Sequence, residues 1–146
     1  MDFKALLSVT ERLVESTGSG VLATIDDDGW PDQRWMTFGL IEGQPGRIFS
    51  VTRSESSAAR QIRSNSAVGL VVQTRPLDEI VTVSGVAVVN DAPAVVSTAL
   101  EALRERLVQF WTRNTDASDL VVIETTVRKL SYVRSAQDER YTAYAE

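Results

Sequence analysis

The sequence contains no cysteine and no histidine among its 146 residues. Without cysteine, the chain cannot form disulfides, thiolate nucleophiles, zinc fingers or cysteine-ligated iron–sulfur clusters. Without histidine, it has no Ser-His-Asp triad, no histidine metal site and no imidazole acid–base chemistry. Any catalysis must therefore use carboxylates, Lys or Arg side chains, hydroxyl groups or a cofactor.

Long apolar runs are also missing. Charged residues interrupt the first helix-like stretch at Asp2, Lys4, Glu11, Arg12 and Glu15, so we expect no apolar signal-peptide core. The longest apolar runs, such as residues 67–72, are far shorter than the roughly 20 residues of a membrane span. We therefore expect a cytoplasmic protein with no membrane partner.

The charge balance is acidic, with 15 basic and 20 acidic residues and a net charge of −5. This balance does not favour nucleic acid as a partner, because nucleic-acid recognition usually needs a basic face. The hydrophobic and charged fractions, 43% and 24%, are ordinary for a globular protein. A chain of this length is expected to form one domain with a single core, over residues 1–146.

Hydrophobic periodicity predicts an α+β fold that is mainly β. Helices are predicted over residues 2–16, 54–65 and 93–112, and strands over 21–25, 34–41, 47–52, 67–73 and 79–89, with a sixth over 119–124 and 128–133. Gly85 inside the fifth strand indicates a bulge or a close backbone approach. The strands do not alternate with helices, so the order favours antiparallel pairing over a parallel doubly wound sheet.

Two local patterns exclude other kinds of site. No Gly-x-Gly-x-x-Gly or Walker loop occurs, so the sequence does not indicate dinucleotide or P-loop nucleotide binding. Asp26, Asp27 and Asp28 precede Gly29, a pattern that predicts a solvated hairpin turn rather than a metal site.

Several short motifs follow one another in a fixed order. The segment 21–25 is followed by Gly29, Pro31, Arg34 and Met36, which have the spacing Gly-x-Pro-x-x-Arg-x-Met. The segments 48–52, 54–57, 61–65, 81–87 and 90–91 come next, with weaker matches at 110–111 and 130–132. Together they resemble the FMN-binding split-barrel family, the superfamily of pyridoxamine 5′-phosphate oxidase, and more closely its general stress protein branch. The resemblance implies a six-stranded antiparallel split β-barrel with flanking helices, paired as a homodimer with cofactor sites at the interface.

The resemblance also implies a set of FMN-binding residues. The FMN phosphate carries about two negative charges, which favour Arg, hydroxyls and a helix N-terminus. By resemblance, Arg34 binds this phosphate and Thr52 and Ser57 add hydroxyls. The further cofactor-binding residues that the resemblance implies are Trp35, Met36, Thr37, Val51 and Trp111, with Trp111 reaching across the interface.

Several of these assignments have a structural alternative. Arg34 could be a solvated strand residue, and Trp35 and Met36 could pack in the core or a dimer interface. Ser54, Ser56 and Ser57 could include a helix cap. Residues 110–111 could close the late helix onto the core.

Two departures from the family pattern bear on function. Ala58 stands where the family commonly has a phosphate-pairing Lys, which removes a charge-assisted contact of ~1.5–3 kcal/mol; Arg53 or an Arg from a partner subunit could replace it. The chain has no histidine, and it has Ile80 where the oxidase has a flavin-contacting Gln. The resemblance therefore does not imply true pyridoxamine phosphate oxidase activity.

The resulting hypothesis is an FMN-binding, flavin-dependent oxidoreductase with a small-molecule redox partner and an unknown substrate. The first alternative is a non-catalytic stress-response module that binds a flavin or a related ligand. The second is a split barrel that has lost its ligand. Another flavin or a deazaflavin stays open as the cofactor, whereas the absence of histidine disfavours a His-ligated haem.

Overall fold

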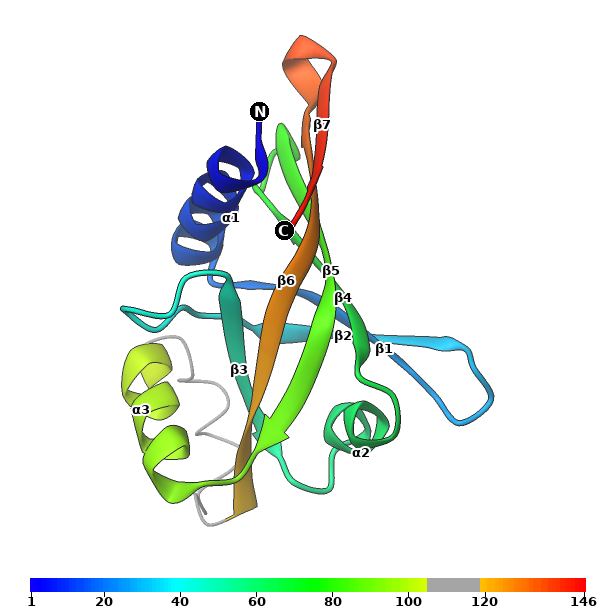
Figure 1. The fold of residues 1–146 in the computed structure, drawn as a ribbon, viewed down its shortest axis with the longest axis vertical. Helices are drawn as coiled ribbons and strands as arrows, with labels where there is room; N and C mark the ends of the chain where they lie inside the picture. Colours follow the sequence, from blue (N-terminus) through cyan, green and yellow to red (C-terminus); the bar gives the residue numbers. More distant parts are fainter. Residues whose placement is uncertain (105–118) are drawn as a thin grey trace.

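An antiparallel sheet forms the centre of the computed structural model, which describes residues 1–104 and 119–146 (Figure 1). In chain order the elements are α1 (Phe3–Thr17), β1 (Ser19–Ile25), β2 (Pro31–Thr37), β3 (Arg47–Arg53), α2 (Ser57–Ser64), β4 (Ala67–Gln73), β5 (Glu79–Asn90), α3 (Pro93–Leu103), β6 (Leu120–Arg134), the short 3-10 helix η3 (Ser135–Gln137) and β7 (Glu139–Tyr144). The predicted α+β, mainly β class is confirmed.

The strand order is β2-β1-β4-β5-β6-β3, and β7 pairs with β6 beside this path. Every pairing is antiparallel. β2 and β3 are thus the two ends of the main path, and a single bridge between Gly39 and Phe49 joins the segment after β2 to β3. The long β5–β6 pair runs through the length of the molecule (Figure 1).

The structure corrects the predicted strands in three respects. The expected six strands are seven in the structure, because β7 forms a short hairpin with β6. β7 was missed because it carries charges at its start and packs only Tyr141 and Ala143 against the core. The second strand spans Pro31–Thr37 rather than the predicted 34–41, so it begins and ends earlier; proline is tolerated as the first residue of a strand. The sixth strand, predicted over 119–124 and 128–133, is one strand, Leu120–Arg134.

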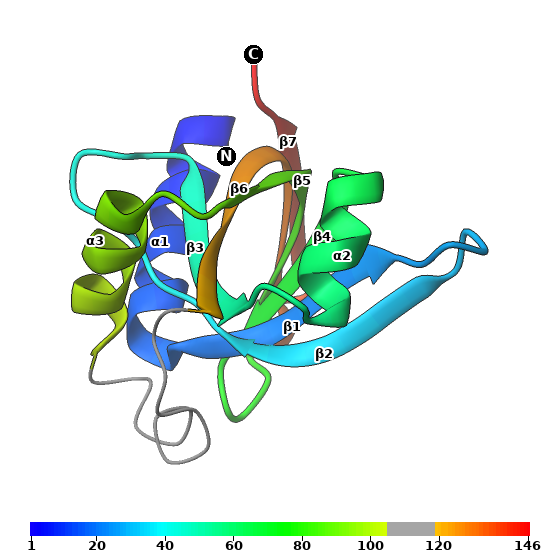
Figure 2. The ribbon, with the colours of Figure 1, turned by 90° about the horizontal axis from the view of Figure 1, so that it is seen from below.

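Two hydrophobic clusters hold the elements together. The larger cluster contains Leu6, Leu13 and Val14 of α1, Ile62 of α2 and strand residues such as Leu22. In the smaller cluster, Val96, Ala99 and Leu103 of α3 pack against β3 and β6. Figure 2 shows the strands curving between α1 and α2, which lie on opposite sides. Helix α3 therefore covers a different face of the sheet from α1 and α2.

Local sequence signals explain how several elements begin, turn or end. Asp2 caps α1 by accepting a hydrogen bond from the Ala5 N–H at 2.9 Å. The Asp26 carboxylate accepts from the backbone N–H groups of Asp28 (2.9 Å) and Trp30 (2.8 Å), so the predicted hairpin turn is confirmed. The bulge predicted at Gly85 is also confirmed, by a register shift between β5 and β6.

Gly85 has a steric reason to be glycine. A Cβ at this position would lie 2.3 Å from the Thr126 carbonyl oxygen on the neighbouring strand. Any side chain would push β5 and β6 apart, so the close approach requires glycine.

The late helix is described only over Pro93–Leu103. The remainder of the predicted segment 93–112, including Trp111, lies outside the described residues. Within residues 1–104 and 119–146, no helix combines the length and the apolar character that a membrane span requires.

Candidate functional site

Strand β2 points Arg34 toward the inner side of the sheet. Side chains alternate between the two faces of a strand, so Asp32, Arg34 and Met36 share one face and Trp35 lies on the other. Thr24 of β1 is the direct partner of Asp32 in the strand register, and Leu22 is the partner of Arg34. The two strands thus place a carboxylate, a guanidinium and a hydroxyl on one face.

The Arg34 guanidinium connects β2 to the start of α2. Its Nη1 donates to the Leu22 carbonyl (3.2 Å), the Thr24 hydroxyl (2.8 Å) and the Asp32 carbonyl (3.0 Å). Its Nη2 lies 3.5 Å from the Ser57 hydroxyl oxygen and 3.1 Å from Asp32 Oδ2. The fold therefore places two of the predicted site residues, Arg34 of β2 and Ser57 of α2, next to each other although they are far apart in the sequence.

Gln61 completes this group, which we call the Arg34 network: Thr24, Asp32, Arg34, Ser57 and Gln61. The Gln61 side-chain amide donates to Asp32 Oδ2 at 2.9 Å and accepts a hydrogen bond from the Thr24 hydroxyl. The sequence analysis missed Thr24, Asp32 and Gln61. Two signals could have found the last two, since Asp32 lies two residues before Arg34 on a strand and Gln61 lies four residues after Ser57 on a helix.

The surroundings of Arg34 disfavour its charge. The Arg34 side chain is 20% exposed and its partner Asp32 is 43% exposed. Burial lowers the pKa of the Arg34 guanidinium, and the Asp32 charge offsets only part of that effect. Because an arginine stays protonated in proteins, this position holds a partly desolvated cation.

The three serines before and at the start of α2 have three different roles. The Ser56 hydroxyl caps the helix by accepting from the Ala59 N–H at 3.1 Å. The Ser54 hydroxyl accepts from Arg63 at 3.0 Å, while Ser57 faces Arg34. The capping alternative therefore holds for Ser56, whereas the Ser57 hydroxyl is not used as the helix cap.

The first turn of α2 adds backbone donors next to Arg34. Ser57 and Ala58 occupy the first two helical positions, whose N–H groups have no intrahelical acceptor. Such N–H groups and the positive end of the helix dipole favour an anion. A hydroxyl, a guanidinium and two backbone donors thus converge where β2 approaches α2.

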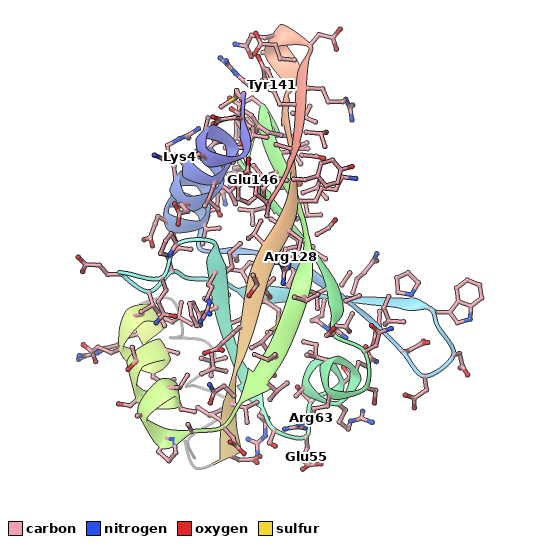
Figure 3. All side chains as sticks on the ribbon, viewed as in Figure 1. Lys4, Glu55, Arg63, Arg128, Tyr141 and Glu146 are labelled. Atoms are coloured by element: carbon pink, nitrogen blue, oxygen red, sulfur yellow. The ribbon has the colours of Figure 1, made fainter. Side chains whose placement is uncertain are left out.

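The other basic side chains around α2 are committed elsewhere. Arg53 forms an ion pair with Asp119 at 3.0 Å. Arg60 Nε donates to the Glu55 carbonyl at 3.3 Å, and Arg63 donates to the Ser54 carbonyl at 2.8 Å. Figure 3 shows Arg63 and Glu55 together at the end of the molecule that carries α2. Arg34 is therefore the guanidinium that faces Ser57 within the described residues.

Ala58 lies in the main hydrophobic cluster rather than on the helix surface. A lysine at this position would have to run its stem through the core before its charge reached water, and a buried ammonium is strongly disfavoured. The packing of α2 against the sheet therefore favours a small apolar residue at position 58 and disfavours the lysine that is common in the family.

The remaining predicted site residues lie on both faces of the sheet. Met36 packs against the main cluster, and Thr37 pairs with Ser19 at the start of β1. Val51 is buried under α3 in the smaller cluster, so Thr52, the next residue of β3, points to the opposite face. Trp35 lies on the outer face of β2 and is 68% exposed.

Two surface hollows adjoin these residues. One of about 560 Å³ lies between the β1–β2 turn and α2, and is lined by Asp26, Asp27, Asp28, Arg60, Gln61, Arg63 and Ser64. Another of about 710 Å³ is lined by Ser16, Thr17, Ser19, Trp35, Gln73, Thr74 and Arg75. Gln61 connects the first hollow to the Arg34 network, and Trp35 forms a wall of the second.

These features define a mainly β antiparallel protein with an anion-compatible corner between an edge strand and a helix start. The chain belongs to the pyridoxamine 5′-phosphate oxidase family, whose model matches residues 8–134. The predicted family resemblance is therefore confirmed. No curated protein matches the chain significantly.

Solved structures of other proteins share the fold. A protein related to general stress protein 26 from Clostridium acetobutylicum has a TM-score of 0.74 and 16% identity, over 97% of this chain and 95% of that one. A heme binding protein from Mycobacterium smegmatis has a TM-score of 0.73 and 20% identity, over 95% of this chain and 57% of that one. An F420 reductase has a TM-score of 0.67 and 22% identity, over 83% of this chain and 94% of that one.

Proposed function

We propose that the protein binds FMN and holds its phosphate between Arg34 and the start of α2. The observation that carries this proposal is the Arg34–Ser57 approach of 3.5 Å beside the first backbone N–H groups of α2. A phosphate needs donors and positive charge, and both converge there around a cation that burial already penalises. Membership of the family supports the same ligand class.

The proposed activity is that of a flavin-dependent oxidoreductase with a small-molecule redox partner. When bound, FMN would supply the electron chemistry, and the protein would supply binding, orientation and electrostatics. Met36, Thr37 and Thr52 are the described residues from which we expect contacts beyond the phosphate, with Trp35 on the outer face of β2. The chain has no histidine to serve as an imidazole acid or base, so a non-catalytic flavin-binding module is the alternative function.

A deazaflavin is the second cofactor candidate, and one of the similar structures is an F420 reductase. A longer acidic tail would need more cations than Arg34 alone. A His- or Cys-ligated haem is disfavoured although another similar structure is a heme binding protein, because this chain has neither histidine nor cysteine. FMN therefore fits the donor set of the corner best.

We also propose that the protein is a homodimer with its cofactor sites at the interface. The outer face of β2, β1, β4 and β5 carries exposed Trp35, Val86 and Val88, with Val21 and Val71 paired between them. Within the described residues, α1 and α2 pack against the main cluster inside the sheet, and α3 covers the outer face only at β3 and β6. This outer face has few charges, which suits an isologous contact between two copies.

The FMN proposal is tested by fluorescence titration of FMN into the wild type and Arg34→Ala. Loss of the charge-assisted contacts should weaken binding by ~10-fold or more. Arg128→Ala is the matched control, because Arg128 is an exposed arginine on β6 (Figure 3) and should bind FMN like the wild type. Equal affinities for all three proteins, or no binding to the wild type, would refute the site.

The dimer proposal is tested by analytical ultracentrifugation of the wild type and Val88→Glu. A second carboxylate at this exposed apolar position, which pairs with Glu124 of β6, would be buried in both copies, so the variant should sediment as a monomer. A monomeric wild type, or a Val88→Glu dimer of unchanged stability, would show that this face is not the interface.

A further inference from the structure

A carboxylate lies inside the corner that the FMN proposal assigns to a phosphate. We infer that Asp32 is a specificity-determining residue, which weakens the binding of a dianionic phosphate group relative to an uncharged form of the same ligand. This inference rests on the proposed function, because it concerns the phosphate end of that ligand.

Asp32 and Arg34 share one face of β2 because they lie two residues apart on a strand. Asp32 Oδ2 lies 3.1 Å from the Nη2 of Arg34, and the same nitrogen lies 3.5 Å from Ser57. A ligand that reaches Nη2 from the α2 side therefore meets the carboxylate at the same nitrogen. Asp32 is an internal anion at the place where an external one would bind.

Other members of the Arg34 network hold this carboxylate in place. Gln61 donates its amide to Asp32 Oδ2 at 2.9 Å, and Thr24 in turn donates to the Gln61 carbonyl oxygen. Thr24 is fully buried, so the chain of hydrogen bonds is anchored in the core. Asp32 can leave Arg34 only if the Gln61 contact also breaks.

The charges determine the direction of the effect. Arg34 brings one positive charge to the corner, and Asp32 brings one negative charge, so the pair has little net attraction for an anion. A dianion placed against Nη2 gains from Arg34 and is repelled by Asp32, and this repulsion is stronger in a partly desolvated corner than in water. An uncharged ligand experiences neither effect.

Asp32→Asn removes the charge and keeps the size of the side chain. Its amide oxygen can still accept from Arg34 or Gln61. We expect the affinity for FMN to rise by about 10-fold, while the affinity for riboflavin, which lacks the phosphate, stays within about 2-fold. Both ligands are titrated at one ionic strength, with flavin and tryptophan fluorescence as the readouts.

Asp138→Asn is the matched control, because it removes one carboxylate from the exposed turn before β7, away from the Arg34 network. It should leave both affinities unchanged. An unchanged FMN affinity in Asp32→Asn, an equal change for both flavins, or weaker FMN binding would each overturn the inference. The last result would mean that Asp32 positions Arg34 for the ligand.

A phosphate measurement separates this inference from the FMN proposal. Inorganic phosphate is added at constant ionic strength, and the melting temperature is followed for the wild type, Asp32→Asn and the double variant Asp32→Asn/Arg34→Ala. If no flavin binds to any of these proteins, the FMN proposal is wrong, and the inference then stands only if phosphate stabilises Asp32→Asn alone. Asp32→Ser replaces Asp32→Asn in all arms if the asparagine variant does not fold.

Discussion

Two arginine–carboxylate pairs in this molecule consist of the same kinds of side chain, but their surroundings shift the pKa of the arginine in opposite directions. Arg12 of α1 makes two contacts to Glu79 at the start of β5, at 2.6 and 3.4 Å, and the Tyr132 hydroxyl donates to the same carboxylate at 2.6 Å. Arg34 of β2 pairs with Asp32 at 3.1 Å beside Ser57. The first pair joins elements far apart in the sequence, whereas the second lies on one strand.

The pKa directions separate the two pairs. Hydrogen bonding to Glu79 raises the pKa of Arg12, and hydrogen bonds from Arg12 and Tyr132 lower the pKa of Glu79. Both charges are therefore stabilised where they lie. Burial instead lowers the pKa of Arg34, so this cation is held in surroundings that disfavour its charge.

Exposure fits the same contrast. The Arg12 side chain is 54% exposed and Glu79 is 23% exposed, so water shares the solvation of the guanidinium that fastens α1 to β5. Arg34 has exchanged most of its water for a few neutral acceptors and one carboxylate. A perturbed cation in such a corner is typical of a binding site, whereas a satisfied pair is typical of structure.

The largest expected effect contrasts the two arginines in FMN binding. Arg34→Ala should weaken FMN binding by ~10-fold or more, because it removes charge-assisted contacts to the phosphate. Arg12→Ala should leave FMN affinity within about 2-fold. Isothermal titration calorimetry of both variants checks this pair, and a similar loss in both would remove the distinction between them.

A second contrast concerns stability. Glu79→Gln should lower the free energy of unfolding by about 1 kcal/mol, because it weakens charge-assisted hydrogen bonds to Arg12 and Tyr132 in a position that water partly screens. Asp27→Asn, on the exposed β1–β2 turn, should change it by less than about 0.5 kcal/mol. Urea unfolding measures both values. A neutral Glu79→Gln would show that the Arg12 pair contributes nothing to the fold.

The pH dependence sharpens the same contrast. Glu79 has a lower pKa in the folded protein than in the unfolded chain. Its ionised carboxylate therefore adds to the free energy of unfolding at pH values above the unfolded pKa, about 4.3. This contribution is lost as the pH falls through the folded pKa. The wild type should therefore lose more stability than Glu79→Gln on going from neutral pH to that acid range. Parallel stability curves for the two proteins would contradict the assignment.

The smallest expected effect distinguishes two neighbouring serines. Ser57→Ala should weaken FMN binding by about 2- to 3-fold, because its contact with Arg34 is long and the backbone donors of α2 remain. Ser56→Ala should instead lower the free energy of unfolding by about 1 kcal/mol through loss of the helix cap. Paired binding and unfolding measurements on both variants test whether the two roles are separate.

Much of the fold could be predicted from local patterns. The turn at Asp26 depends on residues close in sequence, and a glycine inside a strand pattern marked the bulge at Gly85; both predictions are confirmed. The short strand β7 could not be predicted in the same way, because it exists only by pairing with β6. The alternation of apolar and polar residues in β7 is weak, so its sequence alone does not predict a strand. The strand forms because its backbone makes hydrogen bonds to β6.

The candidate site was predictable only in part. The motif around Arg34 and the serines near the start of α2 each matched a family pattern, so the sequence indicated both parts of the candidate site. In the structure, Arg34 and Ser57 are in contact. Asp32, Thr24 and Gln61 were missed because their roles arise from strand register and helix packing, which bring together residues from three elements. The burial of Ala58 likewise depends on how α2 rotates against the core.

The most direct test of the account is the ratio of FMN to riboflavin affinity in the wild type and Arg34→Ala, measured at one ionic strength. The two ligands share the ring and differ in the phosphate, so the ratio isolates the corner between β2 and α2. The account predicts that the wild type prefers FMN and that the preference falls close to one in Arg34→Ala. An FMN preference that survives the loss of Arg34 would contradict it, because the phosphate would then bind elsewhere.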